Sequence, residues 1–238
     1  MYVSGGIGLN IKIIYEDNHL LVVEKPVNML SQEDETGDPD ILSILKQDIK
    51  IRYNKPGNVY LGLVHRLDRP VGGAMVFAKT SKAASRLSEQ IRTGKFMKYY
   101  LAVINGRPDK EKDRLEDYLV KDKAKNIVYV VDKENKEGKK AVLEYKVFEC
   151  KYALSLVEIK LLTGRPHQIR VQFANMGHPL YGDQKYGNEE TQQKRQIALW
   201  SNKIILQHPT TKEEMEFTSF PPEESPWNLF DKLTSQKI

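Results

Sequence analysis

One segment decides how this 238-residue chain folds: Val64-His65-Arg66-Leu67-Asp68-Arg69-Pro70-Val71-Gly72-Gly73-Ala74-Met75-Val76-Phe77. It follows an apolar run at 59–64 that is typical of a strand, and its glycine pair predicts a turn into another strand. Asp68 stands between Arg66 and Arg69, and neighbouring positive charge favours the ionised form of a carboxyl group. The same charge attracts a phosphate backbone. The segment therefore predicts an acidic catalytic residue that works on nucleic acid.

Further strands and helices are expected on both sides of this segment. Strand-like runs lie at 11–15, 20–24, 99–104, 126–131, 141–149, 154–162, 197–206 and 214–218. Helical spacing of apolar residues predicts helices near 41–49, 81–94 and 166–176, with Ser81 as an N-cap and Pro166 in a first turn. Most strand runs follow one another without an intervening helix. The sequence therefore predicts an α+β fold with a mixed, largely antiparallel central sheet and flanking helices.

The length allows one large domain or two small ones, and the short linkers between the expected elements favour one catalytic domain. We expect it at residues 11–230, after a flexible leader or cloning remnant at 1–10 and before a C-terminal tail at 231–238. No apolar run approaches the length of a membrane span, so no membrane partner is expected. The single cysteine, Cys150, precludes an intramolecular disulfide and, interpreted as a buried thiol, suits a reducing cytoplasm. No heptad pattern calls for assembly, so we expect a monomer without an obligate protein partner.

The net charge of +5 matters mainly for where the basic residues lie. Lysines and arginines gather at 79–98, and Arg165 and Arg170 flank a second cluster, Thr163–Arg170. Such patches are typical of proteins that bind RNA or DNA. A third run of lysines at 133–140 is interpreted as a solvated loop or hairpin tip.

Several kinds of catalytic site are disfavoured by the absence of their motifs. The chain has no GxxxxGK[ST] loop and no GxGxxG turn, so no nucleotide cofactor is expected. His65, His167 and His178 lack metal-ligand spacing, and one cysteine excludes a thiolate cage, so no metal is expected. A Ser-His-Asp triad would lack its usual GxSxG elbow.

Arg170 is the partner that the sequence suggests for Asp68. It lies on the predicted helix at 166–176, one position after Ile169, which is expected to face the core. A carboxylate in an apolar setting usually has a positive partner, because an unpaired buried charge is unfavourable. An ordinary structural ion pair and a catalytic carboxylate are equally consistent with this pattern.

The same segments resemble the signatures of a known family. VHRLDRPVGGAMVF at 64–77 resembles the signature of RluA-type pseudouridine synthases, the uridine isomerases of ribosomal and transfer RNA. Lys98-Tyr99-Tyr100 resembles the second motif of that family, and 163–170 with 177–187 resembles the third. The start at 14–26 and the close at 208–221 also match, so the resemblance covers nearly the whole chain in order.

The resemblance implies a role for each matching residue. Asp68 is implied as the catalytic aspartate, Tyr100 as the residue that stacks on the target base, and Arg170 as the salt-bridge partner of Asp68. Arg66 is implied to enter the RNA helix where the flipped nucleotide leaves space. The RNA-binding residues implied by these motifs are Arg66, His65, Arg69, Arg165, His167 and Gln168. Isomerisation involves no net redox change, so the resemblance implies no cofactor and no metal.

Two departures and one alternative accompany the resemblance. Val71-Gly72-Gly73 replaces the usual hydroxyl pair before glycine, and Pro166 replaces a polar residue. The resemblance implies a member without an S4 RNA-binding domain, acting on structured ribosomal or transfer RNA. The alternative is an RNA-binding or ribosome-assembly factor without catalysis, although a pure binder has no need for Asp68.

Overall fold

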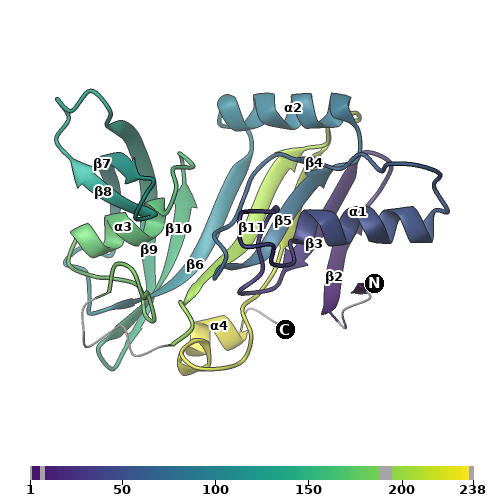
Figure 1. Ribbon diagram of the computed structural model, residues 1–238. Coiled ribbons are helices and arrows are strands. Elements are labelled where there is room, and N and C mark those ends of the chain that lie inside the picture. Colours follow the sequence, from purple (N-terminus) through teal and green to yellow (C-terminus); the bar gives the residue numbers. More distant parts are fainter. Residues whose placement is uncertain (1, 6–8, 188–194, 236–238) are drawn as a thin grey trace. The chain divides into compact units, whose positions relative to one another are not determined.

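The computed structural model describes residues 2–5, 9–187 and 195–235 (Figure 1). The chain divides into two compact units, each of which is described here by itself. The first unit contains Met1–Met97 and Ser201–Ser219, and the second contains Lys98–Trp200 and Phe220–Ile238. Helices and mostly antiparallel strands occur in both, which confirms the predicted α+β class. No helix within the described ranges has the length and hydropathy needed to span a membrane.

The first unit is built on mostly antiparallel strands. They are β1 (Tyr2–Gly5), β2 (Leu9–Glu16), β3 (Leu20–Lys25), β4 (Gly62–Leu63), β5 (Gly72–Ala78), β11 (Leu199–Gln207) and β12 (Glu214–Thr218). The order is β1-β2-β3-β5-β11, with β4 beside β5 and β12 beside β11. The predicted opening hairpin is confirmed, because β2 and β3 pair antiparallel. Its turn is fixed by Asp17, whose Oδ1 accepts the backbone N–H groups of His19 at 2.7 Å and Leu20 at 2.6 Å.

Two helices complete the first unit, α1 (Ile41–Arg52) and α2 (Ser81–Arg92). The N-cap of α2 is Thr80, whose hydroxyl accepts the N–H of Ala83, so the prediction of Ser81 as the cap was wrong by one residue. Thr80 has the extended backbone and hydroxyl that an N-cap requires. The strand expected at 59–64 is reduced to the two residues of β4.

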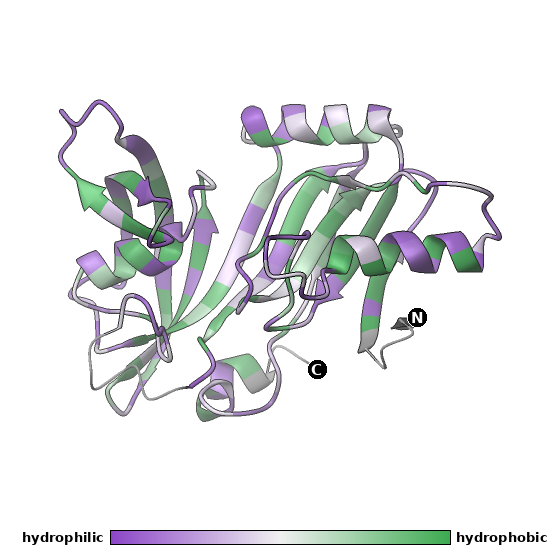
Figure 2. Cartoon of the chain, viewed as in Figure 1, coloured by the Kyte–Doolittle hydropathy of each residue, from purple (hydrophilic) through white to green (hydrophobic). Residues whose placement is uncertain are grey.

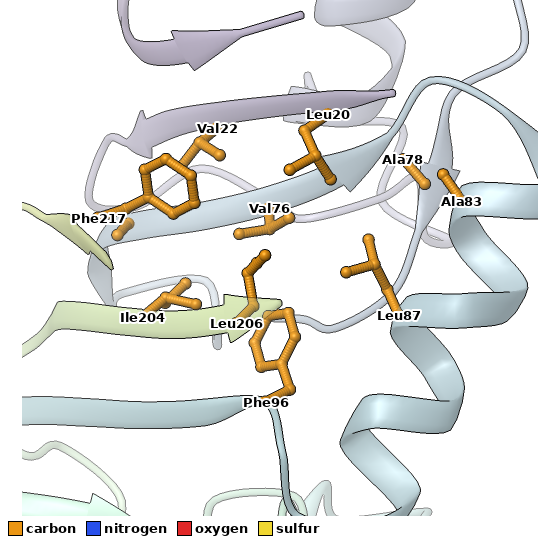
Figure 3. Packing of buried hydrophobic residues seen from close by; sticks show 11 residues of the cluster. Leu20, Val22, Val76, Ala78, Ala83, Leu87, Phe96, Ile204, Leu206 and Phe217 are labelled. Atoms are coloured by element: carbon orange, nitrogen blue, oxygen red, sulfur yellow. The ribbon is translucent and has the colours of Figure 1, made fainter. Parts of the chain in front are cut away.

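The core of the first unit lies between α2 and the sheet. Val22 of β3 and Val76 of β5 face Leu87 of α2, and Ile204 of β11 and Phe217 of β12 close the cluster (Figure 3). All seven residues of β5 are buried, and Figure 2 shows hydrophobic colour along most of β3 and β5. The segment just before β5 is therefore attached to the most buried strand of the unit.

The second unit has its own antiparallel strands and short helices. They are β6 (Met97–Asn105), β7 (Lys112–Asp122), β8 (Ile127–Val131), β9 (Lys139–Lys151), β10 (Leu154–Leu161), α3 (Gln168–Asn175), the 3₁₀ turn η1 (Trp227–Leu229) and α4 (Asp231–Ser235). The strand order is β6-β10-β9-β7-β8. Leu101, Val103 and Leu156 form one core cluster with Trp227 and Phe230.

Three elements of the structure differ from the sequence expectations. β7 is a strand that the apolar pattern did not predict, because its sequence KDRLEDYLVKD is dominated by charged residues that lie mostly at the surface. The expected leader contributes β1, which pairs with β2, and the expected tail contributes α4, where Leu233 is buried. Cys150 is exposed rather than buried. The assignment of residues 11–230 to one catalytic domain stays a prediction.

Candidate active site

Asp68 lies on a tight turn in the first unit, between β4 and β5. The backbone N–H of Val71 donates to the carbonyl of Asp68 at 3.0 Å, which closes the turn directly before the buried strand. Asp68 is half-buried, whereas the neighbouring Arg66 and Arg69 are exposed. The turn therefore holds one carboxylate at a partly covered position with a cationic side chain on each side.

Two buried side chains hold the backbone on both sides of Asp68. The Ser31 hydroxyl donates to the carbonyl of Leu67 at 2.7 Å and accepts its N–H at 3.1 Å. The Lys25 ammonium donates to the carbonyl of Arg69 at 3.1 Å. We call Lys25 and Ser31 the clamp. Since Lys25 is the last residue of β3 and Ser31 follows it by only six residues, the residues before and after Asp68 are fixed to the same part of the unit.

Lys25 is fully buried, and its ammonium group donates three hydrogen bonds. Besides Arg69, it donates to the carbonyls of Pro26 at 2.9 Å and Met29 at 2.6 Å. Burial lowers the pKa of Lys25 to about 7; the carboxylate of Asp68 opposes that shift and the guanidinium of Arg69 adds to it. A titratable cation therefore lies within electrostatic range of Asp68.

The other residues of the HRLDR stretch are held in different ways. His65 accepts the backbone N–H of Val76 through Nε2 at 3.0 Å, so this ring braces the segment against β5. Arg69 forms an ion pair with Asp38 at 2.7 Å, in which both side chains are more than 40% exposed. Arg66 is exposed. Among the described residues, no group of three or more His, Cys, Asp or Glu side chains could hold a metal ion.

Tyr100 lies in β6 of the second unit, opposite Ile159 of β10, and is 5% exposed. Lys98 precedes it by two residues on the same strand. Successive side chains of a strand point to opposite faces, so Lys98 and Tyr100 share one face of β6. Lys98 is 9% exposed, and burial lowers the pKa of its ammonium.

Arg170 is buried in α3 and pairs with Asp183. Its Nε donates to Oδ2 of Asp183 at 2.8 Å and its Nη2 donates to Oδ1 at 2.6 Å, so the contact is bidentate. Asp183 is fully buried and also accepts the backbone N–H groups of Lys185 and Tyr186. The guanidinium lies 5.3 Å from the ring centroid of Tyr186. This arrangement fixes the orientation of Arg170.

The loop before α3 corrects part of the sequence interpretation. The helix begins at Gln168, not at Pro166, and His167 adopts a left-handed backbone with φ of 49°. Nδ1 of His167 lies 2.7 Å from the hydroxyl of Tyr186. Arg165 is exposed, and its Nε donates to the carbonyl of Lys140 at 2.9 Å.

Gln168 was predicted to bind RNA, but its amide is directed inward. Its Oε1 accepts from the Thr163 hydroxyl at 2.7 Å and the Arg165 N–H at 3.0 Å, and its Nε2 donates to Gln172 at 3.0 Å. The residue is 2% exposed. These contacts order the loop before α3, and binding of RNA by Gln168 stays a prediction.

The predicted site residues are divided between the two units. Asp68 belongs to the first, whereas Tyr100 and Arg170 belong to the second. The salt bridge from Arg170 to Asp68 stays a prediction. Sequence reasoning missed three residues with strong contacts: Lys25, Ser31 and Asp183. Lys25 and Asp183 lie within segments that the family resemblance quotes, and that is the only signal that could have identified them.

The comparisons with known proteins agree with these motifs. The sequence profile described as RNA pseudouridylate synthase matches residues 19–175. The chain belongs to the RNA pseudouridylate synthase family. It is 36% identical over 204 residues to the uncharacterized RNA pseudouridine synthase YhcT of Bacillus subtilis, covering 84% of this chain and 65% of that protein. It is 32% identical over 214 residues to ribosomal large subunit pseudouridine synthase C of Buchnera aphidicola, covering 87% and 66%.

The chain thus spans about two thirds of the length of these family members. Among solved structures, human RNA pseudouridylate synthase domain containing 4 matches with a TM-score of 0.75 at 23% identity, covering 89% of this chain and 88% of that one. Human RNA pseudouridylate synthase domain containing 1 matches with a TM-score of 0.71 at 22% identity, covering 95% of each. At these identities the structural likeness shows that the fold is shared.

Proposed function

We propose that this protein is an RNA pseudouridine synthase, with a catalytic domain at residues 11–230, that isomerises uridine in structured ribosomal RNA. The observation that carries the proposal is the turn of Asp68. One carboxylate is held at a partly covered position by buried side chains on both sides, next to two exposed arginines. The name of the Buchnera relative supports the large ribosomal subunit as the source of the substrate.

The chemistry assigns a different task to each residue. The target uridine leaves the RNA stack, its glycosidic bond is cleaved, and the base rotates and rejoins the ribose through C5. Asp68 acts as the ionised catalytic group and Tyr100 supports the flat face of the extruded base. Arg170, already oriented by Asp183, ion-pairs with Asp68. Arg66, which is exposed, fills the space that the base leaves.

Contacts outside the reacting nucleotide involve other residues of the motifs. Arg69 and Arg165 are exposed and cationic, so we assign them to RNA phosphates. His65 and His167 hold the segments that carry Asp68 and Arg170. The reaction rearranges bonds within one nucleotide, and the assigned residues perform it without a redox partner.

Release of the C5 hydrogen provides the test, because forming the new bond at C5 expels it. Ribosomal RNA labelled with tritium at C5 of uridine should release tritium when wild-type protein is added. The Asp68→Asn variant should release none while it binds RNA and unfolds as the wild type does, since the amide has nearly the same shape but no charge. Asp109→Asn is the matched control, because Asp109 is an exposed carboxylate in the other unit and should leave tritium release unchanged. Full activity of Asp68→Asn would refute the assignment of Asp68, and activity on transfer RNA alone would refute the substrate class.

A further inference from the structure

Lys98 carries a charge that the folded chain does not compensate. The side chain is more than nine-tenths buried. Within the described ranges, no oxygen accepts a hydrogen bond from its ammonium and no acidic group opposes the effect of burial on its pKa. Nζ of Lys98 is not among the fully buried, unpartnered polar atoms of the described residues, so the ammonium keeps some contact with water although its stem is buried. An ammonium held in this way has donors that a ligand can use.

The position of the ammonium identifies where that partner binds. Lys98 pairs with Leu161 at the end of β10, and the chain then continues into the exposed residues Gly164 and Arg165. A Cβ added to Gly164 would lie 3.2 Å from Nζ of Lys98. The tip of the side chain therefore reaches the loop at the surface, and the ligand needs to enter only that far.

The surrounding charge identifies the chemistry of the partner. Arg165, the next residue after Gly164, is exposed and supplies a second cationic side chain on the same loop; its Nε donates to the carbonyl of Lys140. Among the described residues neither Lys98 nor Arg165 forms an ion pair, and two unpaired cations favour an anion. Because Gly164 has no side chain, the anion can approach the loop closely. A phosphate diester satisfies both conditions, since it offers unesterified oxygens to a lysine donor.

We propose that Lys98 binds the RNA backbone phosphate next to the uridine that is isomerised. This inference rests on the proposed function for the identity of that uridine. Lys98 and Tyr100 share one face of β6 two residues apart, which separates them by about 7 Å along the strand. That spacing is comparable to the separation between a base and the phosphate of its own nucleotide. A base stacked on Tyr100 thus brings its phosphate to Lys98.

The main experiment compares Lys98→Met with the wild type in binding to a fluorescein-labelled stem-loop RNA that contains unpaired uridines. Methionine retains most of the length of the side chain without the charge. We expect about tenfold weaker binding, and a slope of log Kd against log salt that is smaller by about 0.7–0.9, as for loss of one phosphate contact. Lys112→Met removes an exposed lysine from β7 of the same unit and should change neither.

Stability measurements separate this role from a structural one. Lys98→Met removes no hydrogen bond within the described part of the chain, so its melting temperature should equal or exceed that of the wild type. A fall in melting temperature with an unchanged salt slope would overturn the proposal, because it would make Lys98 a packing residue.

A second variant tests the same contact without removing the lysine. Gly164→Ala places a methyl group against Nζ, and the flexible lysine tip can yield without disturbing the fold. We expect Gly164→Ala to weaken RNA binding several-fold when it is made in the wild-type protein. When it is added to Lys98→Met, it should cause no further weakening. Independent, additive effects of the two substitutions would contradict a shared site.

Tritium release by the wild type distinguishes the two proposals. If the wild type isomerises uridine and Lys98→Met matches it in affinity and salt slope, only the role of Lys98 is refuted. If the wild type binds RNA but releases no tritium, and Lys98→Met binds as weakly as expected, Lys98 is a phosphate ligand and the isomerase proposal is refuted. Failure of the wild type to bind any RNA refutes both.

Discussion

Two buried lysines in this protein have opposite surroundings. Lys25 in the first unit donates to three carbonyl oxygens and lies near Asp68. Lys98 in the second unit is nearly as buried, yet no described residue accepts a hydrogen bond from it. Burial lowers the pKa of both side chains. The difference shows that burial of a charge alone does not reveal its role, whereas its partners do.

The partners of each lysine indicate what the charge is for. All three hydrogen bonds of the Lys25 ammonium go to backbone carbonyls, and one of these carbonyls belongs to Arg69, the residue after Asp68. Lys25 therefore stabilises the turn that carries Asp68. The ammonium of Lys98 donates instead to the RNA phosphate that we propose as its ligand. We therefore expect substitutions of Lys25 to affect folding and turnover together, and substitutions of Lys98 to affect RNA binding without loss of stability.

The largest effect is expected from Lys25→Met. The substitution leaves three carbonyls without their donor, and we expect the free energy of unfolding to fall by roughly 2–4 kcal/mol. Turnover should fall as well, because the turn of Asp68 loses one of its anchors. Urea unfolding measures the stability, with Lys98→Met as the comparison. Equal stability changes in the two variants would remove the distinction between the two lysines.

A dependence on pH should follow from the same residue. The pKa of Lys25 is lowered to about 7 in the folded protein, whereas an unfolded lysine titrates near 10.4. Between these values the unfolded chain binds more protons, so the free energy of unfolding contributed by Lys25 rises with pH. Asp68 and Arg69 are the charged groups that act on it.

The stability difference between wild type and Lys25→Met should therefore grow from pH 7 to pH 9, by about 2–3 kcal/mol. Below pH 7 it should level off. Urea unfolding of both proteins at several pH values provides the measurement. A difference that stays flat over this window would mean that Lys25 keeps an ordinary pKa in the folded state.

The smallest effect is expected from Ser31→Ala, which removes both hydrogen bonds to Leu67 but no charge. We expect a loss of about 1–2 kcal/mol in stability and slower turnover at unchanged RNA affinity. Ser43→Ala, on the exposed side of α1, is the matched control. Unaltered turnover in Ser31→Ala would show that one anchor of the clamp suffices for Asp68.

The strands with apolar runs were predictable from the sequence, and the charged strand was not. β3 and β5 are mostly apolar and mostly buried, so the hydropathy pattern predicted both strands. β7 lies mostly at the surface, where it pairs with β8 and β9 through backbone hydrogen bonds and where exposed ion pairs such as Lys140–Glu116 join it to β9. Backbone pairing leaves no mark in the hydropathy pattern, and for this reason β7 was missed.

The candidate site was predictable only as far as its motifs reach. HRLDR and the cluster at 163–170 stand out because they concentrate charge. The clamp does not, since Lys25 and Asp68 are 43 residues apart and their relation depends on how β3 and β5 pair. Asp183 illustrates the same limit: its bidentate contact with Arg170 joins a helix to a loop that no local pattern connects.

The discontinuity of the first unit has a consequence for biosynthesis. Its core needs Ile204, Leu206 and Phe217, which follow the entire stretch from Lys98 to Trp200 in the chain. On the ribosome, β3, β5 and α2 emerge long before these partners, whereas most of the second unit can emerge and pack first. Proteins usually fold in the order of their synthesis. Here β3 and β5 must wait, with part of their apolar surface uncovered, until the stretch Ser201–Ser219 has been synthesised.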